Sequence, residues 1–170
     1  SSSIILEDNN FLCDIETFKD WAGDKKQLRM EFFYRMMRKD HQILMDGNQP
    51  IGGKWNFDAQ NRKKAPAQLE VPKTYHIKPD TLSLQAIADT KQYFSDHFGD
   101  IEPFFFAVTR EQALVALKQF IDERLCLFGD YQDAMLQGEP FMFHAHISFY
   151  LNCGLLYPLE CIQAAQSAYE

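Results

Sequence analysis

The sequence lacks the features that define several common classes of protein. No window approaches the roughly 18 uninterrupted apolar residues that a membrane-spanning helix requires. Residues 1–5 have neither the basic segment nor the cleavage pattern of a signal peptide. The four cysteines include no CxxC pair, so we expect reduced thiols in a cytoplasmic protein with no membrane association.

The familiar catalytic and nucleotide-binding motifs are also absent. The sequence has no GxGxxG, no HExxH and no GxSxG, and Lys54 follows a glycine pair without the rest of a phosphate-binding loop. His144 and His146 are two residues apart, with no third metal ligand nearby. We therefore predict no metal site and assign no catalytic residue in this chain.

Basic residues are concentrated in one part of an acidic chain. The net charge is −7, yet residues 25–64 hold ten Lys or Arg against four acids. Such a stretch could contact a phosphate backbone, although a solvated helix face followed by a basic loop is the simpler explanation. Within it, aromatic and basic side chains alternate in a way that suits base stacking and phosphate contact. The candidate nucleic-acid-binding residues are Lys54, Trp55, Arg62, Lys63 and Lys64. Alternatively, the aromatic residues anchor this loop to the core.

Hydrophobic periodicity predicts a mainly α protein. A short strand is expected at residues 4–6, and Asp14 is a good N-cap for the helix that follows. A stronger helix is expected from about 25 to 40, with an apolar stripe that would pack into the core. Residues 41–79 have no helical period and are rich in turn formers, which indicates a long irregular connection.

The second half of the chain has a helical pattern throughout. A helix is expected from residue 80, with Gly99 as its stop. Thr109 and Gln112 have the spacing of a capping box, and the helix after them should bury Leu114 and Leu117, with Ile121 and Leu125, and end at Gly129. Pro158 suits the first position of a last helix.

Several long motifs together have a recognisable pattern. They occupy residues 26–35, 53–63, 97–100, 107–110, 128–135 and 151–156. In this order and spacing they closely resemble the deoxyribodipyrimidine photolyase-related proteins, which are bacterial cryptochromes and (6-4) photolyases with an iron–sulfur cluster. The resemblance covers nearly the whole chain.

The resemblance implies a helical fragment of a photolyase or cryptochrome. Residues 1–40 would be the end of an antenna domain, with its last short strand and a connecting helix. Residues 41–79 would form the interdomain connection, and residues 80–170 the first helices of an incomplete FAD-binding domain. The iron–sulfur cluster and a lumazine antenna would belong to parts of a longer protein outside this chain.

The resemblance also places one edge of the flavin site here. In photolyases a tyrosine and a hydroxyl-rich segment at a helix N-terminus hold the FAD phosphates and ribityl chain, because helix N–H groups and short hydroxyls suit an anion. The matching residues are Tyr131, His144, Ala145, His146, Ile147 and Ser148. Ala145 stands where a hydroxyl is usual, and His146 where an arginine is usual.

The implied function is the light-driven repair of pyrimidine photoproducts in UV-damaged DNA, with electron transfer from FAD, which makes the full-length protein a lyase. Two alternatives remain open. One is a cryptochrome-type light sensor without repair activity, and the other is a degenerate member that binds little flavin. We expect the isolated chain to hold no FAD stably, since one wall of a pocket cannot bury a cofactor.

Overall fold

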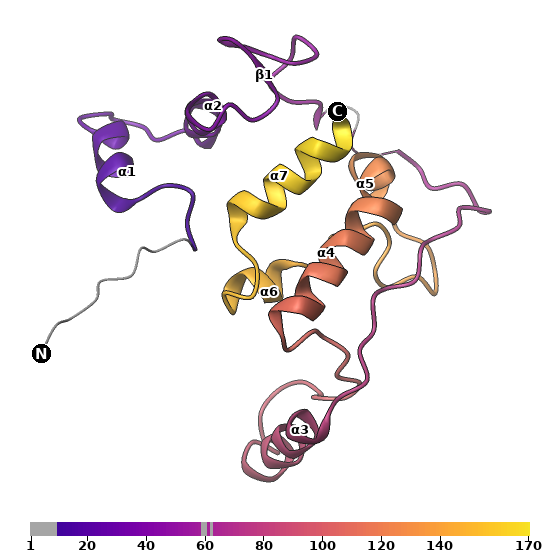
Figure 1. Ribbon diagram of the computed structural model, residues 1–170. Coiled ribbons are helices and arrows are strands. Elements are labelled where there is room, and N and C mark those ends of the chain that lie inside the picture. The colour runs from indigo at the N-terminus through magenta and orange to yellow at the C-terminus, as the bar shows by residue number, and fades with distance from the viewer. Residues whose placement is uncertain (1–9, 59–60, 62) are drawn as a thin grey trace, which may run out of the picture.

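The computed structural model describes residues 10–58, 61 and 63–170. In this part of the chain it contains seven helices and one small two-stranded sheet, so the predicted mainly α fold class is confirmed (Figure 1). The strand expected at residues 4–6 lies outside the described residues. No helix in the described part is long and apolar enough to cross a membrane.

The first two helices pack against each other through aromatic rings. Helix α1 (Ile15–Ala22) begins at Asp14, whose side chain accepts the N–H of Thr17 at 2.7 Å, as the sequence predicts. Helix α2 (Met30–Asp40) begins about five residues later than expected. The rings of Trp21 and Phe33 lie 4.9 Å apart and join the two helices.

The apolar stripe of α2 is not core in this structure. Phe32 is 53% exposed and Leu28 is 51% exposed, and α2 has no fully buried residue. The expectation that the whole stripe packs inside was therefore wrong. The side of α2 that carries Phe33 packs against the rings of Phe18 and Trp21 of α1.

The connection starts with a hairpin and then runs without regular structure. Strands β1 (Met45–Asp46) and β2 (Gln49–Pro50) pair antiparallel. The described residues from 51 to 80 form no α-helix and no strand. This is the long irregular segment that the turn formers and prolines predict.

The core lies among four helices of the second half. Helix α4 (Arg110–Glu123) packs against α5 (Leu125–Tyr131) and α7 (Pro158–Tyr169), and α4 and α7 lie side by side in the centre of Figure 1. Helix α6 (Ser148–Asn152) supplies Tyr150 to the same core. The core residues are Ala107, Ala113, Ala116, Leu117, Phe120, Tyr150, Leu156 and Cys161.

Helix α4 confirms its predicted start and corrects its predicted face. The Thr109 hydroxyl accepts the N–H of Gln112 at 3.3 Å, and the Gln112 side chain accepts in return, so the capping box is present. Leu117 is buried as predicted, and Ile121 and Leu125 pack against the core, but Leu114 is 40% exposed and Ala113 and Ala116 are buried instead. The helix breaks at Arg124 and resumes as α5, which contains Gly129 instead of ending there.

A partly exposed ion pair between Arg110 and Glu160 joins α4 to α7. The Arg110 guanidinium donates to both carboxylate oxygens of Glu160, at 3.0 and 2.7 Å, and to the Leu155 carbonyl at 2.9 Å. These hydrogen bonds raise the pKa of Arg110 and lower the pKa of Glu160. The Glu160 carboxylate also accepts the Tyr157 N–H at 2.7 Å, beside the predicted Pro158 at the first helical position.

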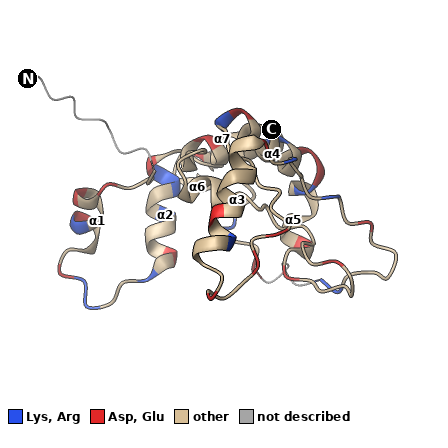
Figure 2. Ribbon diagram, turned by 90° about the horizontal axis from the view of Figure 1, so that it is seen from below, with Lys and Arg blue, Asp and Glu red and all other residues tan. Residues whose placement is uncertain are grey.

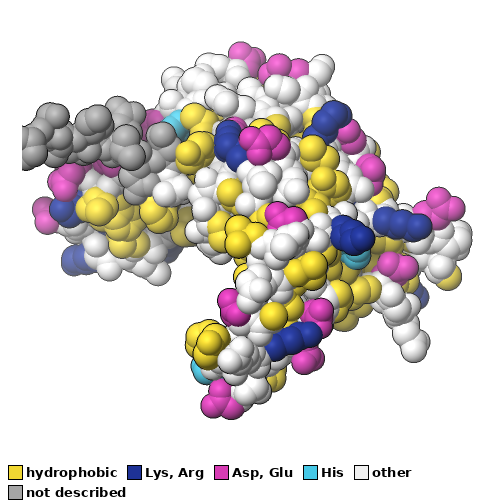
Figure 3. All heavy atoms as spheres, turned by 60° about the horizontal axis from the view of Figure 1, so that its bottom comes forward, with side chains coloured by type: hydrophobic (Ala, Val, Ile, Leu, Met, Phe, Trp, Pro, Cys, Tyr) yellow, Lys and Arg dark blue, Asp and Glu magenta, His cyan; other side chains and the backbone are white. Residues whose placement is uncertain are grey.

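Helix α3 (Thr81–Tyr93) projects from the rest of the described chain, at the bottom of Figure 1. Its one fully buried residue is Ile87, and it ends at Tyr93, so Gly99 lies in the loop beyond and does not stop it. Figure 3 shows hydrophobic side chains on this projecting lobe, in agreement with the high exposure of Tyr93 and Phe98.

Candidate functional site

The candidate flavin edge consists of Tyr131 and the segment 144–148, which joins a buried anchor to helix α6. Phe143 directly precedes the segment and is 1% exposed, so it fixes the segment to the core. Tyr131 is the last residue of α5, and its ring lies 5.9 Å from that of Phe143. The structure therefore brings Tyr131 next to the start of the segment, although 12 positions of sequence separate the tyrosine from Phe143.

The backbone of this segment is unusual. His146 adopts a φ of +54° and Met142 a φ of +43°, values that belong to the left-handed region. Such conformations cost free energy for residues other than glycine and tend to occur where a ligand or a tight fold imposes them. Ala145 and Ile147, between and after them, pack against the core.

Helix α6 begins at Ser148, as a helix N-terminus in the resemblance would require. Its N-cap is Ile147, which provides no side-chain hydrogen bond, so the first N–H groups of the helix have no side-chain partner. The helix has only five residues, however, and so few aligned peptide dipoles contribute little positive charge.

His146 is half-buried and uncharged at neutral pH. Its ring meets Phe141 edge-on at 4.9 Å and stacks against His144 at 6.2 Å. Burial, helped by the positive charge of Arg124 and by His144, lowers the pKa of His146 to about 4. The histidine can therefore exchange hydrogen bonds with a ligand, but it cannot replace the charge of an arginine.

The edge as a whole is a set of hydrogen-bonding groups. His144 and Ser148 are exposed, and Ser148 stands at the start of α6, whose first N–H groups have no side-chain cap. These groups fit phosphate or sugar oxygens in chemical type. In the part of the chain that the structure describes, no three His, Cys, Asp or Glu side chains come together as a possible metal site.

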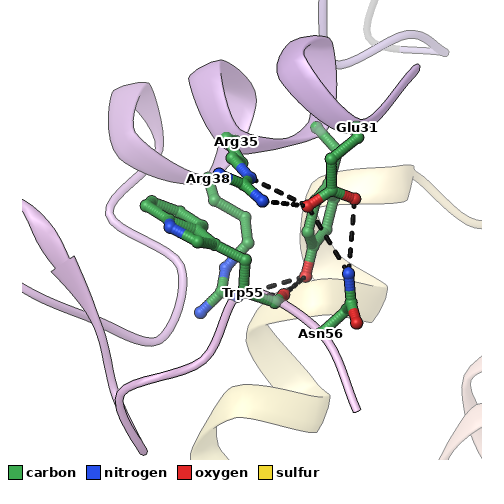
Figure 4. A network of polar contacts seen from close by, with 6 residues as sticks. Glu31, Arg35, Arg38, Trp55 and Asn56 are labelled. Carbon is green, nitrogen blue, oxygen red and sulfur yellow. Dashed lines mark hydrogen bonds and ion pairs between the residues drawn. The ribbon is translucent and has the colours of Figure 1, made fainter. Parts of the chain in front are cut away.

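The basic connection places Trp55 against α2. The guanidinium groups of Arg35 and Arg38 and the ammonium of Lys39 lie 5.3 to 5.6 Å from the Trp55 ring. The Trp55 carbonyl accepts hydrogen bonds from Arg38 and from the Tyr34 hydroxyl (Figure 4). Glu31 of the same network pairs with Arg35 at 2.8 Å.

This arrangement favours anchoring as the role of Trp55 in the described chain. Arg38 also donates to the carbonyls of Ile43 and Leu44, so one side chain ties α2 to both the hairpin and the loop after it. A ring bordered by three cations has less free face for a nucleic-acid base. Anchoring was the alternative explanation of the aromatic residues in this loop.

The other candidate DNA-binding cations differ in exposure and in ion pairing. The Lys63 ammonium pairs with the Asp130 carboxylate at 2.8 Å, and this hydrogen bond and charge raise the pKa of Lys63. The backbone N–H of Lys63 also donates to the Asp130 carbonyl at 3.2 Å. Lys64 and Lys54 are exposed, with the Lys54 ammonium 5.8 Å from the Phe57 ring. Arg62 lies outside the described residues. Figure 2 shows basic and acidic residues interspersed along the ribbon of the described residues.

Sequence reasoning missed Arg124, which is 3% exposed. It caps the end of α4, and its Nη2 donates to the Pro72 carbonyl at 2.5 Å. Beside it, the Gln119 amide donates to the Lys73 carbonyl at 3.2 Å. In the sequence Arg124 directly follows Asp122 and Glu123, which is typical of an exposed position, and only the fold reveals that it is buried.

The chain belongs to the deoxyribodipyrimidine photo-lyase-related protein family, whose model matches residues 1–106. A relative named (6-4) photolyase, from Agrobacterium fabrum, is 48% identical over 97% of this chain. The chain spans 32% of the length of that relative. A protein from Acanthamoeba polyphaga mimivirus, described as uncharacterized, is 37% identical over 39% of this chain and is covered over 36% of its own length.

Proposed function

We propose that the chain is part of a DNA photolyase that repairs UV-induced pyrimidine photoproducts, and that it contributes one edge of the FAD site. The observation that carries the proposal is the 48% identity, over nearly the whole chain, to a protein named (6-4) photolyase. In this proposal residues 1–40 end an antenna domain, residues 41–79 connect two domains, and residues 80–170 begin the FAD-binding domain. A lumazine antenna and an iron–sulfur cluster belong to other parts of the full-length protein.

The residues of the flavin edge divide the work of binding. Ser148 and the first N–H groups of α6 donate hydrogen bonds to phosphate oxygens, and His144 adds a further polar contact from the exposed side. Tyr131, held against Phe143, covers the edge with its ring. When bound, FAD supplies the light-driven electron donation that photoproduct repair requires. The chain itself binds, orients and shields the phosphate end.

A serine substitution tests this edge. Ser148→Ala removes one donor to a charged oxygen, so the affinity of the full-length protein for FAD should fall by roughly ten-fold or more. Ser95→Ala, in the loop after α3, is the matched control because Ser95 is exposed and distant in the sequence from the edge. Equal affinities of the two variants would remove Ser148 from the site.

DNA contact is proposed for the cations of the connection. Lys54 and Lys64 are exposed and free to approach phosphates, whereas Lys63 already holds Asp130. Each freely contacting lysine that is changed to alanine should reduce the slope of log K against log salt by about 0.9. Lys63→Ala should reduce it less than Lys64→Ala. If all three variants keep the wild-type slope, these residues are ordinary surface.

The repair activity is tested with the full-length protein. Duplex DNA that carries a (6-4) photoproduct or a cyclobutane dimer should be restored under blue light and not in the dark. If neither lesion is restored although flavin is bound, the repair proposal fails. A light-dependent change in binding to a protein partner would then support the sensor alternative.

A protein that binds little flavin is the second candidate, because two residues of the edge offer little attraction for a phosphate. Ala145 has no hydroxyl, and the low pKa of His146, about 4, leaves that side chain neutral. Both features reduce the attraction for a phosphate. A full-length protein that purifies without flavin and does not take it up from solution would support this candidate.

A further inference from the structure

Arg124 is a buried cation without a close ion pair among the described residues. It is 3% exposed, no ion pair of the described residues includes it, and burial lowers its pKa although the charge of the adjacent Glu123 opposes this shift. One nitrogen, Nη2, donates to the Pro72 carbonyl, while the buried Nε has no hydrogen-bond partner. A charge taken out of water is strongly disfavoured unless an opposite charge or a full set of hydrogen bonds compensates for it. This arginine therefore has unused capacity to interact with an anion.

The unused side of Arg124 borders the candidate flavin edge. Arg124, Gln119, Tyr150, Ala145 and His146 line one small cavity of about 10 Å³. The Gln119 Oε1 atom in this group also lacks a partner. A cavity of this size holds about one water molecule and has no room for a phosphate group. The arginine can thus act on a ligand at the edge only across Ala145 and His146.

The effect of this charge is visible on His146. The positive charge of Arg124 is one cause, after burial, of the lowered pKa of His146, and His144 adds to it. Tyr75 and Tyr150 also line the cavity, and burial raises the pKa of Tyr150, so this hydroxyl stays neutral at physiological pH. Arg124 and His146 are therefore electrostatically coupled through a poorly solvated space, where a charge acts more strongly than in water.

We propose that Arg124 is a positioning residue that supplies, from inside the fold, the positive charge for a phosphate-bearing ligand at segment 144–148. The proposal rests on the proposed function, in which this ligand is the diphosphate part of FAD. At the edge itself, α6 is short and His146 is uncharged at neutral pH. Arg124 adds an attraction for an anion that these two features do not supply, and the anion adds a counter-charge to that of Glu123.

The same residue links the edge to the connection. Arg124 donates a hydrogen bond to the Pro72 carbonyl and Gln119 donates one to the Lys73 carbonyl, so both side chains bind the end of the irregular segment. A substitution must therefore separate the loss of charge from the loss of the hydrogen bond to the Pro72 carbonyl. Glutamine keeps an N–H donor for the Pro72 carbonyl but has no charge, whereas lysine keeps the charge.

The test compares FAD with riboflavin, which lacks phosphates, in the full-length protein. Arg124→Gln should weaken FAD binding on the order of ten-fold, as expected for a charge that acts through a partly buried space, and leave riboflavin binding unchanged. Arg124→Lys should retain most of the preference for FAD. Arg29→Met, which changes an exposed arginine outside any ion pair of the described residues, should behave as wild type.

A second readout does not depend on the ligand. In Arg124→Gln, the pKa of His146 followed by NMR should rise from about 4 yet stay below 6.5, because burial remains the larger cause. An unchanged FAD preference in Arg124→Gln would overturn the proposal, and so would an equal loss of FAD and riboflavin, which indicates a structural role. If Arg124→Gln does not fold, Arg124→Lys decides: loss of the FAD preference in a folded lysine variant overturns the proposal. A wild-type protein that binds FAD and riboflavin equally also overturns the proposal, because there is then no attraction for the phosphates to explain. A wild-type protein that binds no flavin contradicts the proposed function instead.

Discussion

The hydroxyl of Tyr150 makes a hydrogen bond inside the buried core. It accepts the N–H of Ala107 at 3.2 Å, and the two residues are 3% and 0% exposed. This bond joins α6 to the segment that leads into α4, across 43 positions of sequence. Tyr150→Phe keeps the ring and removes only the acceptor, so the Ala107 N–H would remain in the core without a partner.

The cost follows from that orphaned donor. A buried polar group that loses its partner costs about 1–3 kcal/mol. In a protein of this size, 1 kcal/mol shifts the melting temperature by about 2–4 °C. We therefore expect Tyr150→Phe to lower the melting temperature by roughly 2–12 °C. The ring contacts with Phe149 are unchanged, so the loss should come from the hydrogen bond alone.

Thermal and urea denaturation followed by circular dichroism measure this effect. Tyr93→Phe is the matched control, because it makes the same chemical change on a side chain that is 68% exposed. The control should melt with the wild type. If Tyr150→Phe also melts with the wild type, the Ala107 N–H finds another partner and the reasoning about this core is refuted.

Three further predictions concern stability, reactivity and the connection. The pKa of Glu160 is lowered in the folded state, so the carboxylate contributes its full stabilisation above the ordinary pKa of 4.5. This stabilisation is lost as the pH falls through the lowered, folded-state pKa. In urea titrations the stability difference between wild type and Glu160→Gln should therefore shrink as the pH falls below 4.5. Burial raises the pKa of Cys161 to about 11, so maleimide should label the exposed Cys126 at pH 7 and leave Cys161 unmodified until the protein unfolds, as peptide mass mapping can show. Trp55→Ala should free the connection from α2 and speed proteolysis between residues 54 and 64, and a cleavage rate equal to that of the wild type would exclude the anchoring role.

Local signals in the sequence predicted the starts of three helices well, although α2 begins about five residues later than expected. Asp14 and Thr109 cap helices as expected, and Pro158 begins the last one. Each of these features involves residues within one helical turn, so the sequence contains the whole interaction. The irregular connection was predictable for the same reason, since turn formers act locally.

Features that depend on packing between distant segments were not predictable. The apolar stripe of α2 is partly exposed, and α4 buries Ala113 and Ala116 while Leu114 stays partly exposed. The break at Arg124 separates two helices that the periodicity joined. None of these outcomes follows from a window of neighbouring residues.

The candidate flavin edge came from the resemblance, and its environment came from the structure. The six residues could be named from the sequence, but neither the left-handed φ of His146 nor its lowered pKa could. The lowered pKa depends on burial and on the charge of Arg124, which is 22 positions away in the sequence. The partner of Lys63 likewise lies on α5, 67 positions away, and only the fold brings the two together.

The absorption spectrum of the purified full-length protein tests the central claim most directly. The account predicts a protein with oxidised-flavin bands in the blue region, and FAD that is released when the protein is denatured. A colourless protein that takes up no flavin when FAD is added would contradict the claim that this chain forms one edge of a flavin site.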